Sequence, residues 1–545
     1  MPPTSFGFIL SSLMVLVILP ACTKSCSKSP SSEPLSINIA VGSPIETIDP
    51  RYATSAVASR ASKLVYAPLF DLGVDSSPEP FLAQSIESLD EKTFKLTLRQ
   101  GLSFHDGSKL NAEDVVYTYS QLGQADVVSP HADKFSEYIK NIRAVGEYEV
   151  IFELKQTHAP FLTDLCALGI VSKKSCEGRS QACRHEHNGS GPFRVKNWDS
   201  AKEVLHLTPF ANWYEGAPKN DVLLRVVRDE NTRLLELIGQ KTDLVESDIS
   251  PQNIAELKKH PFLHVQEIAG LGYTYLAFNV RGPRSDDPKN SPQYLTRAAL
   301  ANKKVRQAIA HAIDIDQIID KLLLGSAKRV SGLVPNGHWA KDPELQAPGY
   351  NTKIAEDLLD EAGFKRIGPK NNRFNLVIAT TPNRLRQSIA QLYADFLARV
   401  GIDTTVRVKE WGALYQDMKQ GNFEMFSAVW VPVTEPDLYY FVHHSKSIPE
   451  NNDAGGNRHG YSNPEVDRLI EEGRTTMAPE KRKAIYQQIE RIMIDELPYI
   501  PLWNENRIIV YNSDRLQGFE ALPSGSLLGI RKAYIKGSQG KKAGS

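Results

Sequence analysis

The chain has 545 residues, of which 64 are basic and 64 acidic, so its formal net charge at pH 7 is zero. A nucleic-acid-binding protein needs surplus positive charge to displace counterions, so the composition predicts no nucleic-acid partner. Hydrophobic residues make up 41% and charged residues 23% of the chain, which excludes wholesale disorder, collagen and a protein with many membrane spans. At roughly 150 residues per domain, the length predicts three to four domains or lobes.

The first residues form a predicted targeting segment. Residues 6–19 (FGFILSSLMVLVIL) are an apolar run that is shorter than the about 20 residues needed to span a bilayer. The run has the length of a signal-peptide core. It leads into Leu19-Pro20-Ala21-Cys22, which resembles a bacterial lipobox, in which the cysteine is acylated and the chain is cut just before it.

Two features of this segment depart from the lipobox pattern. No Lys or Arg precedes the apolar run, and Pro20 stands two residues before the cysteine. A plain signal peptide with an incidental cysteine is therefore the alternative. We expect residues 1–21 to be a signal peptide and residues 22–35, rich in Ser, Pro and Lys, to be a flexible tether anchored through a lipid on Cys22.

The cysteines admit several interpretations. An exported protein meets an oxidising compartment, which favours disulfides. Cys176 and Cys183 enclose a short polar loop and could be bridged, whereas Cys166 lies in an apolar run where a buried thiol is the simpler expectation. A zinc site made from Cys176, Cys183, His185 and His187 is possible by count, although its spacing matches no zinc pattern.

The body of the chain alternates short strands and helices, which predicts an α/β fold. Residues 93–98 (TFKLTL) alternate apolar and polar side chains as a half-buried strand does, and Asn111 precedes an acidic first turn as a helix N-cap does. Residues 281–295 are a polar, proline-containing loop and a candidate lobe boundary, and residues 536–545 are a tail predicted to be disordered. Other strands are predicted at residues 36–41, 147–154, 204–208, 222–227, 374–380 and 403–408, and other helices at residues 231–239, 305–324, 352–362, 385–400, 464–474 and 480–496.

No set of residues predicts catalysis. The chain contains neither the G-x-S-x-G nucleophile elbow nor the G-x-x-x-x-G-K-[ST] phosphate loop. Gly270 and Gly272 supply part of a dinucleotide-binding fingerprint, but Tyr275 occupies its third glycine position. The adjacent His443 and His444 point in divergent directions, so we expect a solvated loop pair and no metal site. The sequence predicts neither an enzyme nor a cofactor.

Several segments, in order, resemble the bacterial extracellular solute-binding proteins for oligopeptides, dipeptides and nickel, which are the substrate-capture subunits of ABC importers. The strongest match is residues 94–119 (FKLTLRQGLSFHDGSKLNAEDVVYTY), which resembles the family's strand, "FHDG" turn and "AeDVv" helix. The resemblance covers most of the chain after the predicted signal peptide. Its other segments are residues 46–50 (ETIDP), 189–193 (GSGPF) with Trp198, 212–218 (NWYEGAP), 276–279 (LAFN), 305–314 (VRQAIAHAID), 362–364 (AGF), 461–467 (YSNPEVD) and 497–503 (LPYIPLW).

The resemblance implies a two-lobed periplasmic-binding-protein fold of class α/β, with a hinge and an additional subdomain inserted in lobe one. Residues 276–279 and 497–503 then mark the two hinge crossings. The implied division is residues 36–68, 188–278 and 501–535 for lobe one, residues 69–187 for the inserted subdomain and residues 279–500 for lobe two.

The resemblance also implies a function. The protein is expected to capture oligopeptides or dipeptides between its lobes and to deliver them to an ABC permease and its ATPase. It is expected to be a monomer that is exported and lipid-anchored to a bacterial membrane, with its functional domain in the periplasm or outside the cell. The alternative is a non-peptide ligand on the same fold, such as a metal chelate, haem or an N-blocked molecule; an exported enzyme is less expected.

The ligand site is expected between the lobes, along residues 407–440 of lobe two. Trp411 and Trp430 resemble the family's cleft tryptophans, although either could instead lie in the core. The predicted ligand-binding residues are Tyr273, Trp411, Tyr415, Trp430, Glu435, Asp437 and Tyr439.

The loop after Trp430 departs from the pattern of peptide-binding members. Where those members carry an aspartate that pairs with the ligand's α-ammonium, this chain has Val433. Glu435 and Asp437 are the acids that remain on the loop. If neither faces the ligand, a free amino terminus would be buried without a counter-ion, which costs several kcal/mol.

Overall fold

The computed structural model describes residues 35–537, apart from residues 54, 74–76, 123, 125–126, 128, 130, 247–248, 370, 431–432 and 453–454. The predicted signal peptide, residues 22–34 of the predicted tether with Cys22, and residues 538–545 of the predicted tail lie outside the described residues. Within the described part, no helix combines the length and the apolar character needed to cross a membrane.

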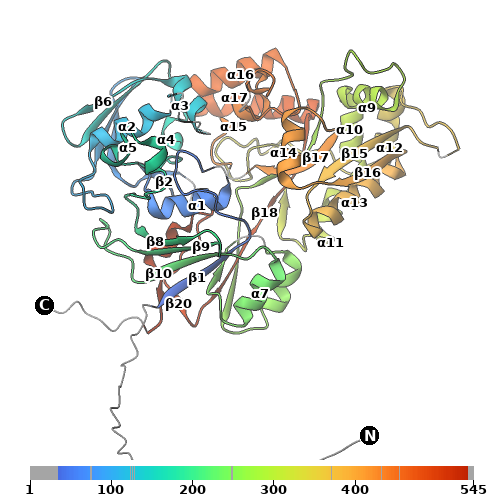
Figure 1. The fold of residues 1–545 in the computed structure, drawn as a ribbon. Coiled ribbons are helices and arrows are strands. Elements are labelled where there is room, and N and C mark those ends of the chain that lie inside the picture. The colour runs from blue at the N-terminus through green and yellow to red at the C-terminus, as the bar shows by residue number, and fades with distance from the viewer. Residues whose placement is uncertain are drawn as a thin grey trace, which may run out of the picture.

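The first lobe is built on a seven-stranded sheet that the beginning, middle and end of the chain assemble together (Figure 1). β1 (Ser36–Val41) runs parallel to β10 (Asp221–Val226) on one side and to β11 (Leu244–Val245) on the other. The other strands of this sheet are β8 (Phe193–Asp199), β9 (Val204–Pro209), β12 (Leu263–Ile268) and β19 (Arg507–Asn512). Around it lie α1 (Ala56–Val65), α7 (Glu230–Ile238), η1 (Pro251–Asn253), α8 (Ile254–Leu257), β20 (Leu516–Gln517), η3 (Leu527–Lys532) and β21 (Tyr534–Ile535).

A separate four-stranded antiparallel sheet is formed between β1 and β8 in the chain, in the order β4-β5-β7-β6. Its helix α2 (Ala112–Gln121) begins at a capping box, because Asn111 Oδ1 accepts from the backbone N–H of Glu113 while Asp114 accepts from that of Asn111. Its elements are β4 (Ala83–Ser88), β5 (Thr93–Leu98), α3 (Ala132–Tyr138), β6 (Ile139–Val145), β7 (Glu149–Leu154), α4 (Phe161–Asp164), α5 (Lys173–Cys176) and α6 (Ser180–Cys183), with β2 (Phe70–Leu72) and β3 (Pro78–Pro80) pairing nearby.

The second lobe is built on a six-stranded sheet in the order β14-β18-β13-β17-β15-β16. β13 (Tyr273–Phe278) lies between β17 (Met425–Trp430) and β18 (Tyr499–Glu505) and is antiparallel to both. Side chains alternate across a strand, so Leu276 and Phe278 join one core and Tyr273 and Tyr275 the other. The remaining strands are β14 (Ala327–Arg329), β15 (Phe374–Thr380) and β16 (Ile402–Val408).

Helices cover both faces of this sheet (Figure 1). The face of Leu276 and Phe278 is covered by α9 (Pro292–Ala301), α10 (Lys303–Ala312), α11 (Ile315–Lys321), α12 (Thr352–Glu361) and α13 (Arg384–Arg399). The face of Tyr273 and Tyr275 is covered by α14 (Trp411–Lys419), α15 (Leu438–His443), α16 (Pro464–Thr475) and α17 (Pro479–Glu496), with η2 (Ser445–Ser447) after α15.

The chain passes between the two large sheets at residues 269–272 and at Asn506. These crossings lie side by side, because a Cβ atom on Gly270 would come within 2.1 Å of the carbonyl oxygen of Glu505. The boundaries expected at residues 278 and 501 differ from this arrangement. β13 is buried at every residue and β18 at all but its last, so both are interior strands of the second lobe and not hinge segments.

Two helix predictions need correction. The single helix expected over residues 305–324 is wrong, because α10 ends at Ala312 and a new helix, α11, starts at Ile315. Asp314 caps α11: its carboxylate accepts a hydrogen bond from the backbone N–H of Gln317, 2.9 Å away. The loop expected over residues 281–295 is also wrong at its end. Ser291 caps α9, and Pro292 occupies the first helical turn, where its missing N–H costs nothing.

Candidate ligand-binding site

Stacked aromatic rings fill the centre of the second lobe where β13, β17 and β18 meet. The ring of Tyr275 stacks on that of Tyr499, with centroids 4.2 Å apart, and lies parallel to the ring of Trp430 at 6.1 Å. Tyr273 is paired with Trp430 across the two strands. Tyr273, Tyr275 and Tyr499 are buried, so of this group only Trp430 keeps partial exposure.

The predicted site residues fall into two sets. Trp411 is 51% exposed at the start of α14, and Tyr415 lies one turn later with its ring 6.0 Å away. Together with Trp430 these form a partly exposed aromatic group. Tyr273 and Tyr439, in contrast, lie in the core at 3% and 1% exposure, so neither presents surface to a ligand in this structure.

A buried arginine that the sequence did not single out joins the exposed aromatic group. The guanidinium carbon of Arg458 lies 4.7 Å from the ring centroid of Tyr415 and 5.2 Å from that of Trp430. A cation against an aromatic face is attracted by the ring quadrupole. In the sequence, Arg458 is one of 64 basic residues, and only its place three residues before the YSNPEVD segment could have drawn attention to it.

Both acids of the loop after Trp430 are held by arginines of the same lobe. Arg482 on α17 donates to both carboxylate oxygens of Glu435. Burial raises the pKa of Glu435, and the charge and hydrogen bonds of Arg482 oppose that shift. Arg474 on α16 pairs with Asp437, with Nε 3.0 Å from Oδ1. A ligand ammonium would therefore have to compete with an internal guanidinium for either acid.

Arg474 also joins the second lobe to the four-stranded sheet. Its two terminal nitrogens donate to the carboxylate of Glu137 on α3, each at 3.3 Å, and its backbone carbonyl accepts from the N–H of Ala159 at 2.8 Å. A cavity of about 580 Å³ opens beside this contact. Its lining, drawn from both sides, is Glu137, Lys155, Gln156, Tyr440, Lys446, Glu471, Glu472, Arg474 and Thr475.

His443 and His444 are buried, at 2% and 1% exposure, so the solvated pair expected from the sequence is wrong. The Nδ1 atom of His443 lies 3.1 Å from the Nε2 atom of His459, and burial lowers the pKa of His443 to about 3, so the ring is neutral at pH 7. Among the described residues, no group of three or more His, Cys, Asp or Glu side chains is arranged to hold a metal ion.

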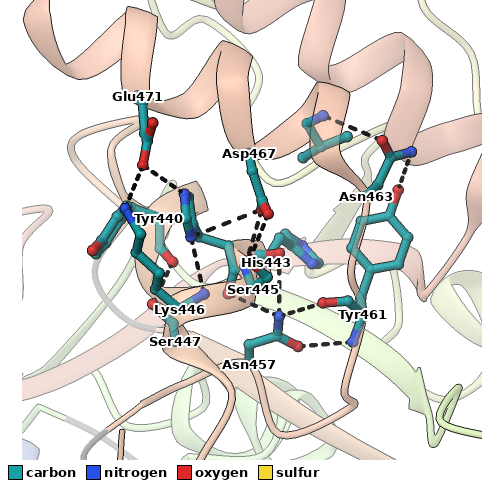
Figure 2. A network of polar contacts seen from close by, with 12 residues as sticks. Tyr440, His443, Ser445, Lys446, Ser447, Asn457, Tyr461, Asn463, Asp467 and Glu471 are labelled. Carbon is teal, nitrogen blue, oxygen red and sulfur yellow. Dashed lines mark hydrogen bonds and ion pairs between the residues drawn. The ribbon is translucent and has the colours of Figure 1, made fainter. Parts of the chain in front are cut away.

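Asn457 fixes the segment that precedes Arg458 (Figure 2). Its amide nitrogen donates to the backbone carbonyls of His443, His444 and Tyr461 at 2.8–3.2 Å, and its amide oxygen accepts from the N–H of Tyr461. The amide is completely buried. A side chain that satisfies four bonds at once pins the chain between α15 and α16, and it does so immediately before Arg458.

Cys176 and Cys183 form a disulfide. Their sulfur atoms are therefore not available as thiolate ligands. This excludes the zinc site considered above, in which these two cysteines would join His185 and His187 as the four ligands. Cys166 is buried, and its thiol lies 3.6 Å from the carbonyl oxygen of Leu162.

The comparisons with known proteins agree on one family. The model of the bacterial extracellular solute-binding proteins, family 5 (its middle region), matches residues 77–452. The oligopeptide-binding protein AppA of Bacillus subtilis is 26% identical over 97% of this chain and 98% of its own length. The structure of that protein with a nonapeptide matches 92% of this chain and 100% of its own at 24% identity, with a TM-score of 0.78.

A second solved structure, NikZ of Campylobacter jejuni with Ni(L-His), matches 92% of this chain and 99% of its own at 24% identity, with a TM-score of 0.81. Both structural matches show the two-lobed fold over nearly the whole described chain. The family match spans more than half of the sequence and includes β17 and the loop after it. The chain therefore belongs to the bacterial extracellular solute-binding proteins of family 5.

Proposed function

We propose that this protein is the extracytoplasmic substrate-binding component of an ABC importer, which captures oligopeptides or dipeptides between its lobes and delivers them to a membrane permease. The observation that carries the proposal is the architecture. The chain crosses between the two large sheets at two adjacent places, residues 269–272 and Asn506, and the second lobe carries a partly exposed aromatic group. Such a joint permits hinge closure around a ligand. The name of AppA, an oligopeptide-binding protein, supports peptides as the ligand class.

We propose the following division of the chain. The four-stranded sheet and its helices form a subdomain inserted in lobe one, and the lobe boundaries follow the sheets, which moves them from residues 278 and 501. The proposed ranges are residues 36–68, 188–268 and 507–535 for lobe one, residues 69–187 for the subdomain and residues 273–505 for lobe two.

We further propose that the protein is made with a signal peptide at residues 1–21 and is anchored through a lipid on Cys22. The apolar run and the lipobox-like LPAC segment support this. Residues 22–35 then form the tether between the membrane and the first lobe. The protein acts as a monomer beside its permease, in the periplasm or outside the cell, and leaves its ligand chemically unchanged.

A non-peptide ligand is the second candidate, and one specific feature favours it. Val433 replaces the ammonium-binding aspartate and is itself 1% exposed, while Glu435 and Asp437 are held by Arg482 and Arg474. None of these three side chains is free to neutralise a peptide's amino terminus. The structural neighbour NikZ, solved with Ni(L-His), shows that this fold accommodates a metal chelate.

Retention of defined peptides tests the proposed function. Purified protein is mixed with degenerate pools of di- to nonapeptides, and the retained masses are read by native mass spectrometry. We expect retention of intact peptides together with a change in tryptophan fluorescence, because Trp411 and Trp430 are partly exposed. Retention of no peptide would reject peptides as the ligand class. Steady release of cleaved products by clean protein would reject a pure binding function.

A further inference from the structure

Arg458 differs from every other buried arginine in the described part of the chain. Seven arginines there are buried, and six of them place their guanidinium on carboxylate or carbonyl oxygens. Arg458 is 7% exposed, its Nε is buried without a hydrogen-bond partner, and its side chain makes no ion pair with any described residue. The six partnered arginines are Arg51, Arg233, Arg306, Arg373, Arg474 and Arg482.

A buried guanidinium with no acid beside it is costly, because water is removed and nothing replaces it. The rings of Tyr415 and Trp430 offset part of that cost by cation–π attraction. They leave the N–H donors unused, and arginine keeps its positive charge at any physiological pH. Such a side chain is suited to receive an anion, above all the planar carboxylate that its fork of donors matches.

The position of Arg458 is fixed before any ligand arrives. Asn457, the residue before Arg458, is held by the four hydrogen bonds of its own side chain (Figure 2). Arg281 donates to the backbone carbonyl of Arg458 at 2.7 Å. Arg281 is itself neutralised by Glu450, with nitrogen–oxygen distances of 2.9 and 3.0 Å. Both contacts act on the backbone at residues 457 and 458 and not on the guanidinium of Arg458.

The charge of the surrounding site is inverted relative to an ammonium-binding site. Val433 carries no charge, and the acids Glu435 and Asp437 are each matched by an arginine on α17 or α16. His459, next to Arg458, has a pKa lowered well below its ordinary value, chiefly by burial, and so stays neutral. The uncompensated charge beside Trp430 is therefore positive.

We infer that Arg458 anchors the ligand by binding a carboxylate that lies against Trp430 and Tyr415. The inference rests on the proposed function and names the chemical class of its ligand. In a peptide, the carboxylate is that of the C-terminus or of an acidic side chain; in a non-peptide ligand, it belongs to an organic acid. A free amino terminus is not the recognised group.

Modified peptides distinguish whether the bound carboxylate is that of the peptide C-terminus or that of an acidic side chain. The di- to nonapeptide pools are prepared free, N-acetylated and C-amidated, each with and without Asp and Glu. We expect the free and N-acetylated pools to be retained. If the C-terminus is the bound group, amidation abolishes retention of the pools that lack acidic residues; if a side chain is, the amidated pools with Asp or Glu are still retained. Equal retention of the free and the amidated non-acidic pools would overturn the inference while leaving the proposed function intact.

Matched arginine variants identify the residue. Arg458→Gln should weaken binding of the retained peptide at least about 100-fold, because a buried charge pair is lost, and Arg458→Lys should recover only part of the affinity. Arg468→Gln, which removes an exposed arginine of α16, is the control and should bind like the unaltered protein. Equal binding by the Gln variants at 458 and 468 would overturn the assignment to Arg458.

Thermal melting of the ligand-free variants shows whether a loss of binding is caused by misfolding. Removing a buried charge that has no acid partner relieves a desolvation cost, so Arg458→Gln should melt at the same or a higher temperature than the unaltered protein. If no peptide pool is retained, the proposed peptide function fails separately, and succinate, glutarate and citrate are titrated against tryptophan fluorescence. A response that Arg458→Gln abolishes supports the carboxylate anchor; no response to any of the three overturns it.

Discussion

Tyr440 donates its hydroxyl hydrogen to Glu137 at 2.8 Å, across the boundary between the second lobe and the four-stranded sheet and over 303 residues of sequence. The guanidinium of Arg474 stacks on the ring of Tyr440, 3.7 Å from its centroid, and donates to the same carboxylate. Figure 1 shows α16 beside α3, where these residues meet. One carboxylate on α3 thus gathers a hydroxyl and a guanidinium from the opposite side, and the contact stabilises the approach of the two parts.

Replacing Glu137 should weaken this approach and, with it, ligand retention. Glu137→Gln removes the charge that Arg474 and Tyr440 share. Because the carboxylate is partly exposed, we expect a loss of about 1 kcal/mol, or roughly a fivefold weaker affinity for the retained peptide. Tyr440→Phe removes one hydrogen bond and should cost less. Calorimetry measures both; an unchanged affinity in Glu137→Gln would show that the contact does not contribute to the bound state.

The acids of the loop after Trp430 should matter for stability more than for binding. Glu435→Gln leaves Arg482 buried without its partner, which should lower the free energy of unfolding by about 3 kcal/mol. Asp437→Asn should lower it less, because Arg474 keeps Glu137. Peptide affinity should fall less than about threefold in both, as expected for acids that do not touch the ligand.

Chemical denaturation and calorimetry on the same variants check this prediction. Asp403→Asn, on a polar edge strand, provides a control for the loss of one carboxylate. A loss of two or more decades of affinity with unchanged stability would mean that Glu435 or Asp437 holds a ligand ammonium.

Stability should fall in mild acid because of the buried histidine pair. Burial lowers the pKa of His443 to about 3 in the folded protein, whereas the unfolded chain protonates it near about 6.5. Between these two pKa values the unfolded state binds more protons than the folded state. The contribution of His443 to the free energy of unfolding is therefore fully present above about pH 6.5 and is lost as the pH falls toward 3. In this range the free energy of unfolding falls by about 1.4 kcal/mol per pH unit for each such histidine. His459, whose pKa is also lowered, acts in the same direction.

Denaturant unfolding at a series of pH values measures the slope. His443→Gln should reduce this slope by about 1.4 kcal/mol per pH unit, the contribution of one histidine. An identical slope in the unaltered protein and in His443→Gln would contradict the burial of a neutral imidazole.

The proposed lipid anchor on Cys22, which lies outside the described residues, can be tested by mutation. If Cys22 is acylated, Cys22→Ser should move the protein from the membrane fraction to the soluble fraction or block its processing. A protein held by several acyl chains stays on a bilayer, whereas an unacylated one does not. Cys26→Ser, four residues later in the tether, should leave the distribution unchanged. Identical fractionation of all three proteins would indicate simple secretion.

Much of the local structure was determined by the sequence itself. The alternation in TFKLTL predicted β5, and Asn111 with its acidic first turn predicted the start of α2, because both signals are carried by neighbouring residues. The ordered family segments likewise indicated the two-lobed fold and the family, which the comparisons confirmed. The helix break at Asp314 escaped prediction because the apolar periodicity continues on both sides of a cap.

Only the tertiary structure decided which charges are satisfied. The partners of Glu435 and Asp437 lie on α17 and α16, and Glu137 meets Arg474 over 337 residues, so no local pattern could pair them. The same holds for the ring pair around Arg458 and for the burial of His443. Periodicity shows which face of an element is apolar, but the identity of the group opposite depends on how distant elements dock. The charge preference that we propose for this site therefore depends on that docking.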